Sequence, residues 1–179
     1  MQQNNTRNTK TLVLCSILIA LSLITNNLLK FHMPYGGSIT LCSMLFVGLC
    51  GYFSGPKYGF MSGFAFGILN ALIGGFSGLH WMSLILDYLL AFMAFGVTGF
   101  FRNKKSGLFI GYSLGVLGRF ISSFLSGWLL FGSYAPEGQA PWLYSLLYQI
   151  SYIVPEYALT MIILAIPMVH NTLYKLKST

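Results

Sequence analysis

Long apolar runs that carry almost no charge are the feature that most constrains this chain. From Thr11 to Leu29 there is not one charged residue, and similar runs recur as far as the C-terminal region. Charged residues make up 7% of the chain, whereas soluble domains carry about 25%. A fold with so few charges would not stay dissolved in water. The sequence therefore predicts a membrane protein.

Six apolar stretches are candidates for transmembrane helices, which need about 20 mostly apolar residues each. The predicted helices cover residues 11–29, 39–54, 58–74, 80–101, 107–132 and 142–174. The last is too long for one upright span, so we expect Pro155 to kink it and its final turns to stand in the cytosol. No small-residue cleavage site follows the first helix, which we expect to be retained. The sequence thus predicts an all-α, polytopic membrane protein with six transmembrane helices in a single domain, residues 1–179.

The positions of the basic residues predict the orientation of the helices, because cytoplasmic loops are enriched in Lys and Arg. If both termini are cytosolic, Lys30 alone faces outside and Arg119 lies within a helix. The other eight of the ten basic residues are then cytosolic: Arg7, Lys10, Lys57, Arg102, Lys104, Lys105, Lys175 and Lys177. Their scatter between apolar runs argues against nucleic-acid binding, despite a net charge of +7. We therefore expect both termini in the cytosol.

Glycines recur at four-residue spacing in two of the predicted helices. They are Gly59, Gly63 and Gly67 in one helix, and Gly107, Gly111 and Gly115 in the other. A face of small residues lets two helix backbones approach closely in lipid, where packing drives association. We expect both faces to pack against other helices of the same chain.

Asp87 stands in an apolar run, and a carboxylate in the membrane needs a partner, a cavity or a function. Its cost near the centre of a membrane helix is about 2.5–3.5 kcal/mol on insertion scales. At a rise of about 1.5 Å per residue, Asp87 and Arg119 lie at matching depths in the outer half of the membrane, whereas Glu156 lies deeper. One prediction is a buried Asp87–Arg119 ion pair. The other is a ligand site in which Asp87 faces a wet cavity, and the two can coexist.

Aromatic residues gather at the same predicted depth as Asp87. They are Tyr88, Trp128, Phe131, Tyr144, Tyr148 and Tyr152, and Gln149 borders them. The last three tyrosines are four residues apart and form one helix stripe. Aromatic faces attract cations and stack on flat rings, and an amide both donates and accepts hydrogen bonds. The set suits a flat, polar, cationic heterocycle, although an interfacial aromatic belt is the alternative.

The segment FHMPYGGSITL, residues 31–41, predicts a structured external loop. Proline fixes one backbone dihedral angle and glycine permits positive ones. Ser38 is placed to cap the helix predicted over 39–54. We predict a lid over the cavity formed by Met33, Pro34, Gly36, Gly37 and Ser38, with a plain tight connector as the alternative.

The stretches MPYGGSITLCSML and LDYLLAFMAFGVTGFFR resemble the thiamine-specific S-components of energy-coupling factor (ECF) transporters. The resemblance covers most of the chain and includes GW…SYA…YSL across the last two predicted helices. It implies a substrate-binding subunit in the plasma membrane of a prokaryote, with thiamine as ligand. It also implies a chain that is not an enzyme and that works with a coupling transmembrane subunit and two cytosolic ATPase subunits.

The resemblance also implies roles for individual residues. Asp87 matches an acidic residue that faces the thiazolium cation, and Tyr88 is part of the same pocket. Tyr144, Gln149 and Gly127 match a tyrosine, an amide and a small residue of the family's site. Ser123 stands where some members carry histidine, and Phe131 where some carry tryptophan. With Tyr148, the predicted substrate contacts are Asp87, Tyr88, Ser123, Gly127, Phe131, Tyr144, Tyr148 and Gln149.

Family members meet the coupling subunit through small residues four apart on the first helix. Ser16 and Ala20 have that spacing here, on a helix without charge from Thr11 to Leu29. We therefore predict that these two residues contact the coupling subunit.

Other functions stay open. One is an S-component for another vitamin or precursor, such as hydroxymethylpyrimidine or riboflavin. Another is a self-sufficient transporter in which Asp87 binds a proton. An intramembrane enzyme is disfavoured, because the three acidic residues are scattered and His32, His80 and His170 are dispersed. The sequence indicates no cofactor or metal site, and no Walker motif is present, so an ATP-driven step needs another chain.

Overall fold

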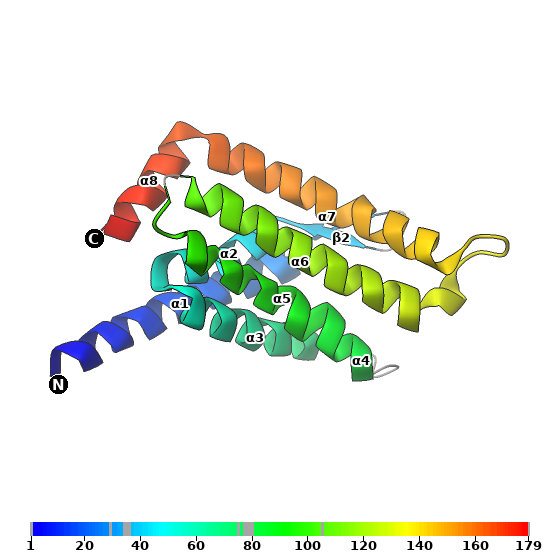
Figure 1. The fold of residues 1–179 in the computed structure, drawn as a ribbon, viewed down its shortest axis with the longest axis horizontal. Helices are drawn as coiled ribbons and strands as arrows, with labels where there is room; N and C mark the ends of the chain where they lie inside the picture. The colour runs from blue at the N-terminus through cyan, green and yellow to red at the C-terminus, as the bar shows by residue number, and fades with distance from the viewer. Residues whose placement is uncertain are drawn as a thin grey trace.

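The computed structural model describes residues 2–28, 30–33, 37–74, 76, 81–104 and 106–178, which form a helical bundle with one small β-hairpin (Figure 1). Pro34 and Gly36 of the predicted lid, Lys105, and the predicted helix ends at Leu29 and His80 lie outside the described residues. In chain order the elements are α1 (Gln2–Leu28), β1 (Lys30–His32), β2 (Ser38–Thr40), α2 (Ser43–Ser54), α3 (Pro56–Ile73), α4 (Trp81–Ser83), η1 (Leu84–Leu90), α5 (Ala91–Met93), η2 (Ala94–Phe101), α6 (Gly107–Leu130), η3 (Gly132–Tyr134), α7 (Pro141–Ala165) and α8 (Pro167–Ser178).

The elements α4, η1, α5 and η2 form one apolar rod, Trp81–Phe101, here called the central rod. Its geometry changes along its length, from a π-helical turn in η1 to a 3₁₀-helix in η2. Asp87 lies within the π-helical turn. Such turns are rare and frequently accompany functional sites.

Glycines on α3 and α6 hold the central rod from two sides. A Cβ added at Gly63 of α3 would lie 2.8 Å from Met93 Cα. A Cβ added at Gly111 of α6 would lie 2.7 Å from Thr98 Cα. The remaining glycines of the two predicted faces, Gly59, Gly67, Gly107 and Gly115, also abut the central rod. The predicted packing role is confirmed, because a larger residue would force the backbones apart.

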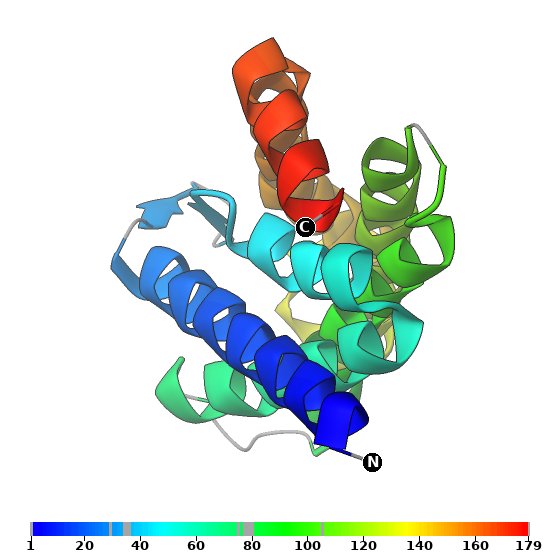
Figure 2. The same ribbon diagram turned by 90° about the vertical axis from the view of Figure 1, so that its left-hand side faces the viewer.

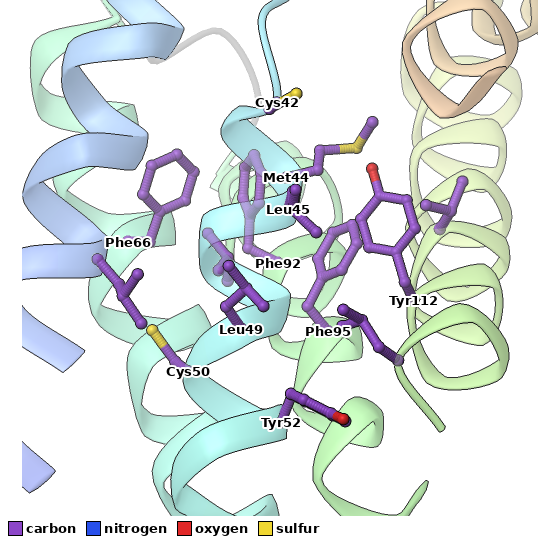
Figure 3. Packing of buried hydrophobic residues seen from close by; sticks show 14 of the residues in the cluster. Cys42, Met44, Leu45, Leu49, Cys50, Tyr52, Phe66, Phe92, Phe95 and Tyr112 are labelled. Carbon is purple, nitrogen blue, oxygen red and sulfur yellow. The ribbon is translucent and has the colours of Figure 1, made fainter. Parts of the chain in front are cut away.

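The apolar core lies where α2 meets α3, α6 and the central rod (Figure 3). The Phe66 and Phe92 rings meet edge to face with centroids 4.6 Å apart, and the Phe95 and Tyr112 centroids are 5.7 Å apart. All three cysteines, Cys15, Cys42 and Cys50, are free and buried in this cluster, as the apolar runs around them predict. Aromatic packing of this kind fixes how the helices are rotated against one another.

Both termini lie at the same end of the bundle, which is the end that faces the viewer in Figure 2. Within the described residues, four helices are long and apolar enough to cross a membrane: Asn8–Leu28, Trp81–Phe101, Gly107–Leu130 and Pro141–Ala165. The helix α2 is apolar but has only 12 residues. The mostly helical membrane fold is thus as predicted, while the count of six spans and the side of the termini stay predictions.

The last predicted helix is two helices in the structure. The helix α7 continues through Pro155 and ends at Ala165, and Ile166 is extended with φ −64° and ψ 119°. Pro167 then begins α8. The chain therefore divides at Ile166 and not at Pro155, because the residue before a proline avoids helical angles and proline is well tolerated in a first turn.

The hairpin replaces the start of the predicted second helix. Its strands are antiparallel, and Ser38 pairs with His32. The prediction that Ser38 caps a helix beginning at Ile39 is wrong, since α2 begins at Ser43 after Cys42 at φ 60°. Ile39 and Thr40 are β-branched residues, which fit an extended strand better than a first helical turn.

Candidate ligand-binding site

A cavity of about 460 Å³ is lined mainly by residues of the central rod, α6 and α7. The start of the central rod, the end of α6 and the start of α7 lie at the end of the bundle opposite the termini (Figure 1). Small-molecule sites typically measure about 300–1,000 Å³. All eight residues predicted as substrate contacts line it: Asp87, Tyr88, Ser123, Gly127, Phe131, Tyr144, Tyr148 and Gln149. The fold thus brings together residues from three helical elements, and their contact with a ligand remains a prediction.

The Asp87 carboxylate stands on the cavity wall and is held from α6. Its Oδ2 accepts a 2.5 Å hydrogen bond from the Ser126 hydroxyl. One turn earlier, the Ser122 hydroxyl donates to the carbonyl of Leu86 at 2.6 Å. Sequence reasoning missed Ser126, although two serines four residues apart on an apolar helix are a recognisable signal of polar contact between helices.

Arg119 lines the same cavity without pairing with Asp87. Its Cζ lies 4.6 Å from the centroid of the Phe92 ring, in a cation–π contact. Its Nε is buried without a hydrogen-bond acceptor among the described residues. Both Asp87 and Arg119 are described, and no ion pair of 4 Å or less joins them. The predicted pair is therefore not formed, because Ser126 engages the carboxylate while Phe92 engages the guanidinium.

The predicted tyrosine stripe of α7 forms one wall of the cavity. The ring centroids of Tyr144 and Tyr148 are 6.3 Å apart, and those of Tyr148 and Tyr152 are 5.7 Å apart. The Tyr152 hydroxyl donates to Gln149 Oε1 at 2.5 Å, and Gln149 Nε2 donates to the Ser123 carbonyl at 3.1 Å. The wall therefore joins α7 to α6 through the Gln149 amide.

The aromatic residues at the end of α6 divide between the outer surface and the cavity. Trp128 is 43% exposed, packs on Phe124 and does not line the cavity. Phe131 packs on Tyr134, with centroids 6.1 Å apart, and both line the cavity. Sequence reasoning missed Tyr134, since it lies in the short η3 turn and follows no helical period.

Gly127 lets α6 and α7 approach each other at the cavity. A Cβ added there would lie 3.1 Å from Ser145 Cβ and 3.6 Å from Gln149 Nε2. The missing side chain leaves space beside the amide that a larger residue would fill.

The hairpin packs against the back of the tyrosine wall. The Met33 amide donates to the Gly37 carbonyl at 2.7 Å, next to the His32–Ser38 pair of the two strands. Gly37 is buried, and a Cβ added to it would lie 2.7 Å from Tyr152 Cγ. Met33, Gly37 and Ser38 of the predicted lid are thus placed next to the site, while lid function stays a prediction.

The predicted partner residues Ser16 and Ala20 are both exposed on α1. Cys15 and Leu18 of the same helix are buried against the bundle. The small residues therefore face away from the core, and their contact with a coupling subunit stays a prediction.

A bundle with several membrane-length helices around a polar, aromatic-walled cavity is the architecture of a multi-pass membrane protein with a candidate site for a small molecule. The model of the family described as "Thiamine transporter protein" matches residues 12–176. The thiamine transporter ThiT of Bacillus subtilis (strain 168) is 30% identical over 147 residues, covering 75% of this chain and 76% of that protein. The chain therefore belongs to the thiamine transporter protein family. A structure of ThiT from Listeria monocytogenes, phased by native SAD, has the same fold, with a TM-score of 0.75 at 20% identity over 89% of this chain and 93% of that one.

Proposed function

We propose that this protein binds thiamine in the cavity as the S-component of an ECF importer in the plasma membrane of a prokaryote. The observation that carries the proposal is the Asp87 carboxylate, which lines an aromatic-walled cavity without a guanidinium partner. Thiamine is a cation made of two flat rings, a thiazolium and an aminopyrimidine, joined by a methylene group. Its thiazolium charge complements Asp87, and its rings suit the faces of Tyr88, Tyr144 and Tyr148.

The contacts of the two charged residues that line the cavity also favour a cationic ligand. The Arg119 guanidinium lies against the Phe92 ring, and the Asp87 carboxylate accepts from the Ser126 hydroxyl. No ion pair of 4 Å or less joins Asp87 and Arg119, so a bound cation could pair with the Asp87 carboxylate. A charge within a membrane is costly unless it is paired or hydrated, so a monovalent cation is the fitting occupant.

The proposed delivery step requires other chains. The sequence contains no Walker motif, so hydrolysis of ATP falls to two cytosolic ATPase subunits, reached through a coupling membrane subunit. The whole chain, residues 1–179, acts as one substrate-binding domain and is not itself an enzyme. The exposed Ser16 and Ala20 of α1 form the proposed contact with the coupling subunit.

The experiment compares Asp87→Asn with the native protein, using thiamine and a neutral thiazole analogue in calorimetry. Asn keeps the size of the side chain and removes its charge. Hydrogen bonds to charged groups contribute about 1.5–3 kcal/mol, so we expect roughly 10- to 150-fold weaker thiamine binding and a much smaller loss for the neutral analogue.

The matched control is Glu137→Gln, which removes the charge of an exposed carboxylate outside the cavity and should leave both affinities unchanged. Equal losses for the charged and neutral ligands in Asp87→Asn would refute the role of Asp87. Native protein that binds riboflavin or hydroxymethylpyrimidine and not thiamine would refute the substrate. Uptake into vesicles that hold this chain alone would refute the need for partners and favour the self-sufficient transporter.

A further inference from the structure

Glu156 is a buried carboxylate that the proposed ligand contacts do not use. It is 1% exposed and lies in α7, four residues after Tyr152. Its Oε2 accepts from the Thr40 amide at 3.2 Å, and its Oε1 accepts from the Thr40 hydroxyl at 2.6 Å. The Ser43 hydroxyl lies 3.3 Å from the same Oε1. These hydrogen bonds of Glu156 with Thr40 and Ser43, here called the clasp, attach the end of β2 and the first turn of α2 to α7.

The clasp continues to α1 through a further buried bond. The Ser22 hydroxyl, which is 0% exposed, donates to the Ser43 carbonyl at 2.7 Å. Thr40 and Ser43 also share a 2.6 Å hydrogen bond. The clasp therefore ties α1, the hairpin and α2 to one point on α7.

The same face of α7 carries the polar wall of the cavity. Tyr152 is one turn from Glu156, and its ring is packed against the hairpin residue Gly37. The Tyr152 hydroxyl holds Gln149, which in turn bonds the Ser123 carbonyl. The hairpin that Glu156 clasps thus supports the tyrosine that orients the amide.

A glutamate inside a membrane-length helix is an expensive choice for a merely structural contact, because its carboxyl group needs hydrogen-bond partners there. Both Glu156 and Arg119 are described, and no ion pair of 4 Å or less joins them. Glu156 accepts with both of its oxygens, whereas an amide offers one acceptor oxygen and an apolar residue offers none. Replacing it would leave a buried donor of Thr40 unsatisfied, which costs the desolvation free energy of that donor.

We propose that Glu156 is a positioning residue for ligand binding, which fixes the hairpin behind Tyr152 and thereby holds the Gln149 amide in its binding geometry. This inference rests on the proposed function, because it assumes that the cavity holds the ligand. Glu156 itself does not line the cavity. Its influence on the ligand is therefore indirect, through Tyr152 and Gln149.

The test measures thiamine affinity and dissociation rate of the purified full chain carrying Glu156→Gln, alone and combined with Gln149→Ala. We expect Glu156→Gln to weaken thiamine binding about 10-fold, because the amide leaves one buried donor of Thr40 without its acceptor. In the Gln149→Ala background the same substitution should cost less than about 2-fold, because residues in one network are not additive. The matched control is Glu137→Gln, the same substitution at an exposed carboxylate outside the cavity, and it should leave the affinity unchanged.

A second pair of variants covers the case in which Glu156→Gln does not fold. Thr40→Val removes the hydroxyl donor of the clasp, and Thr40→Ser keeps it. Thr40→Val should weaken binding and lose its effect in the Gln149→Ala background, while Thr40→Ser should match the native protein. Native affinity in Glu156→Gln, or equal losses with and without Gln149→Ala, would overturn the inference. Native protein that fails to bind thiamine would instead remove the proposed function itself.

Discussion

Asp87 and Ser126 are joined by a 2.5 Å hydrogen bond that runs from α6 to the central rod, with the carboxylate as acceptor. Ser126 is 0% exposed, whereas Asp87 lines the cavity. The serine therefore holds the carboxylate from behind and leaves its other side toward the cavity. This arrangement answers the electrostatic problem of a lone acid in a membrane helix, because a buried hydroxyl and a polar cavity share its solvation.

We expect Ser126→Ala to weaken thiamine binding while the protein stays folded. A typical hydrogen bond contributes about 0.5–1.5 kcal/mol net, which corresponds to a loss of roughly 2- to 13-fold in affinity. Calorimetry on the purified protein measures the change. The control is Ser122→Ala, one turn away, whose hydroxyl bonds the Leu86 carbonyl and not Asp87. A larger loss in Ser122→Ala than in Ser126→Ala would contradict the assignment.

We expect Gly127→Val to reduce both ligand affinity and thermal stability. The added side chain would press on Ser145 and on the space beside Gln149, and overpacking costs about 1–3 kcal/mol. Thermal melts and binding titrations check the two effects. Leu129→Val changes a residue of the same helix that is 66% exposed, and it should alter neither. Native affinity in Gly127→Val would show that the cavity does not need the close approach of α6 and α7.

We expect Gly63→Ala to destabilise the bundle by forcing α3 away from the central rod. Its Cβ would lie 2.8 Å from both Met93 Cα and the Phe92 carbonyl carbon. The two helices would have to move apart, and overpacking of this kind lowers the free energy of unfolding by about 1–3 kcal/mol. The melting temperature in detergent should fall. Met61→Ala serves as the control on the same helix, because Met61 is 54% exposed. An unchanged melting temperature in Gly63→Ala would mean that the glycine face does not determine packing.

We expect Ala20→Phe to prevent assembly with the coupling subunit and to leave thiamine binding intact. Ala20 is exposed on α1 and does not line the cavity. A bulky side chain there should therefore obstruct a helix of the coupling subunit and leave the ligand site unchanged. Co-purification with the partner subunits and a binding titration separate the two effects. Leu21→Phe adds bulk at the next position, also exposed but turned about 100° around the helix, and it should assemble normally. Assembly of Ala20→Phe at native yield would rule out this contact face.

Much of the candidate site is readable from the sequence. Asp87, Gln149 and the stripe of Tyr144, Tyr148 and Tyr152 line one cavity because helical spacing places them on facing sides at a similar height. Gly127 was predicted for the site through the family resemblance alone, and its place at the contact of α6 and α7 comes from the structure. Trp128, next to it in sequence, faces outward, since adjacent helix positions point about 100° apart.

The composition of the chain determined its membrane environment and its helical fold, and the four-residue spacing of its glycines determined the faces that pack α3 and α6 on the central rod. These depend on apolar length and on the period of 3.6 residues, which are local properties. Only the tertiary structure decided the partners of the buried charges. Matching depths make Asp87 and Arg119 plausible partners, yet Asp87 bonds Ser126, Arg119 stacks on Phe92, and Glu156 holds Thr40. The reason is that depth follows from position along a helix, whereas a hydrogen bond depends on helix rotation and on separations of a few tenths of an ångström, which packing of all the helices sets together.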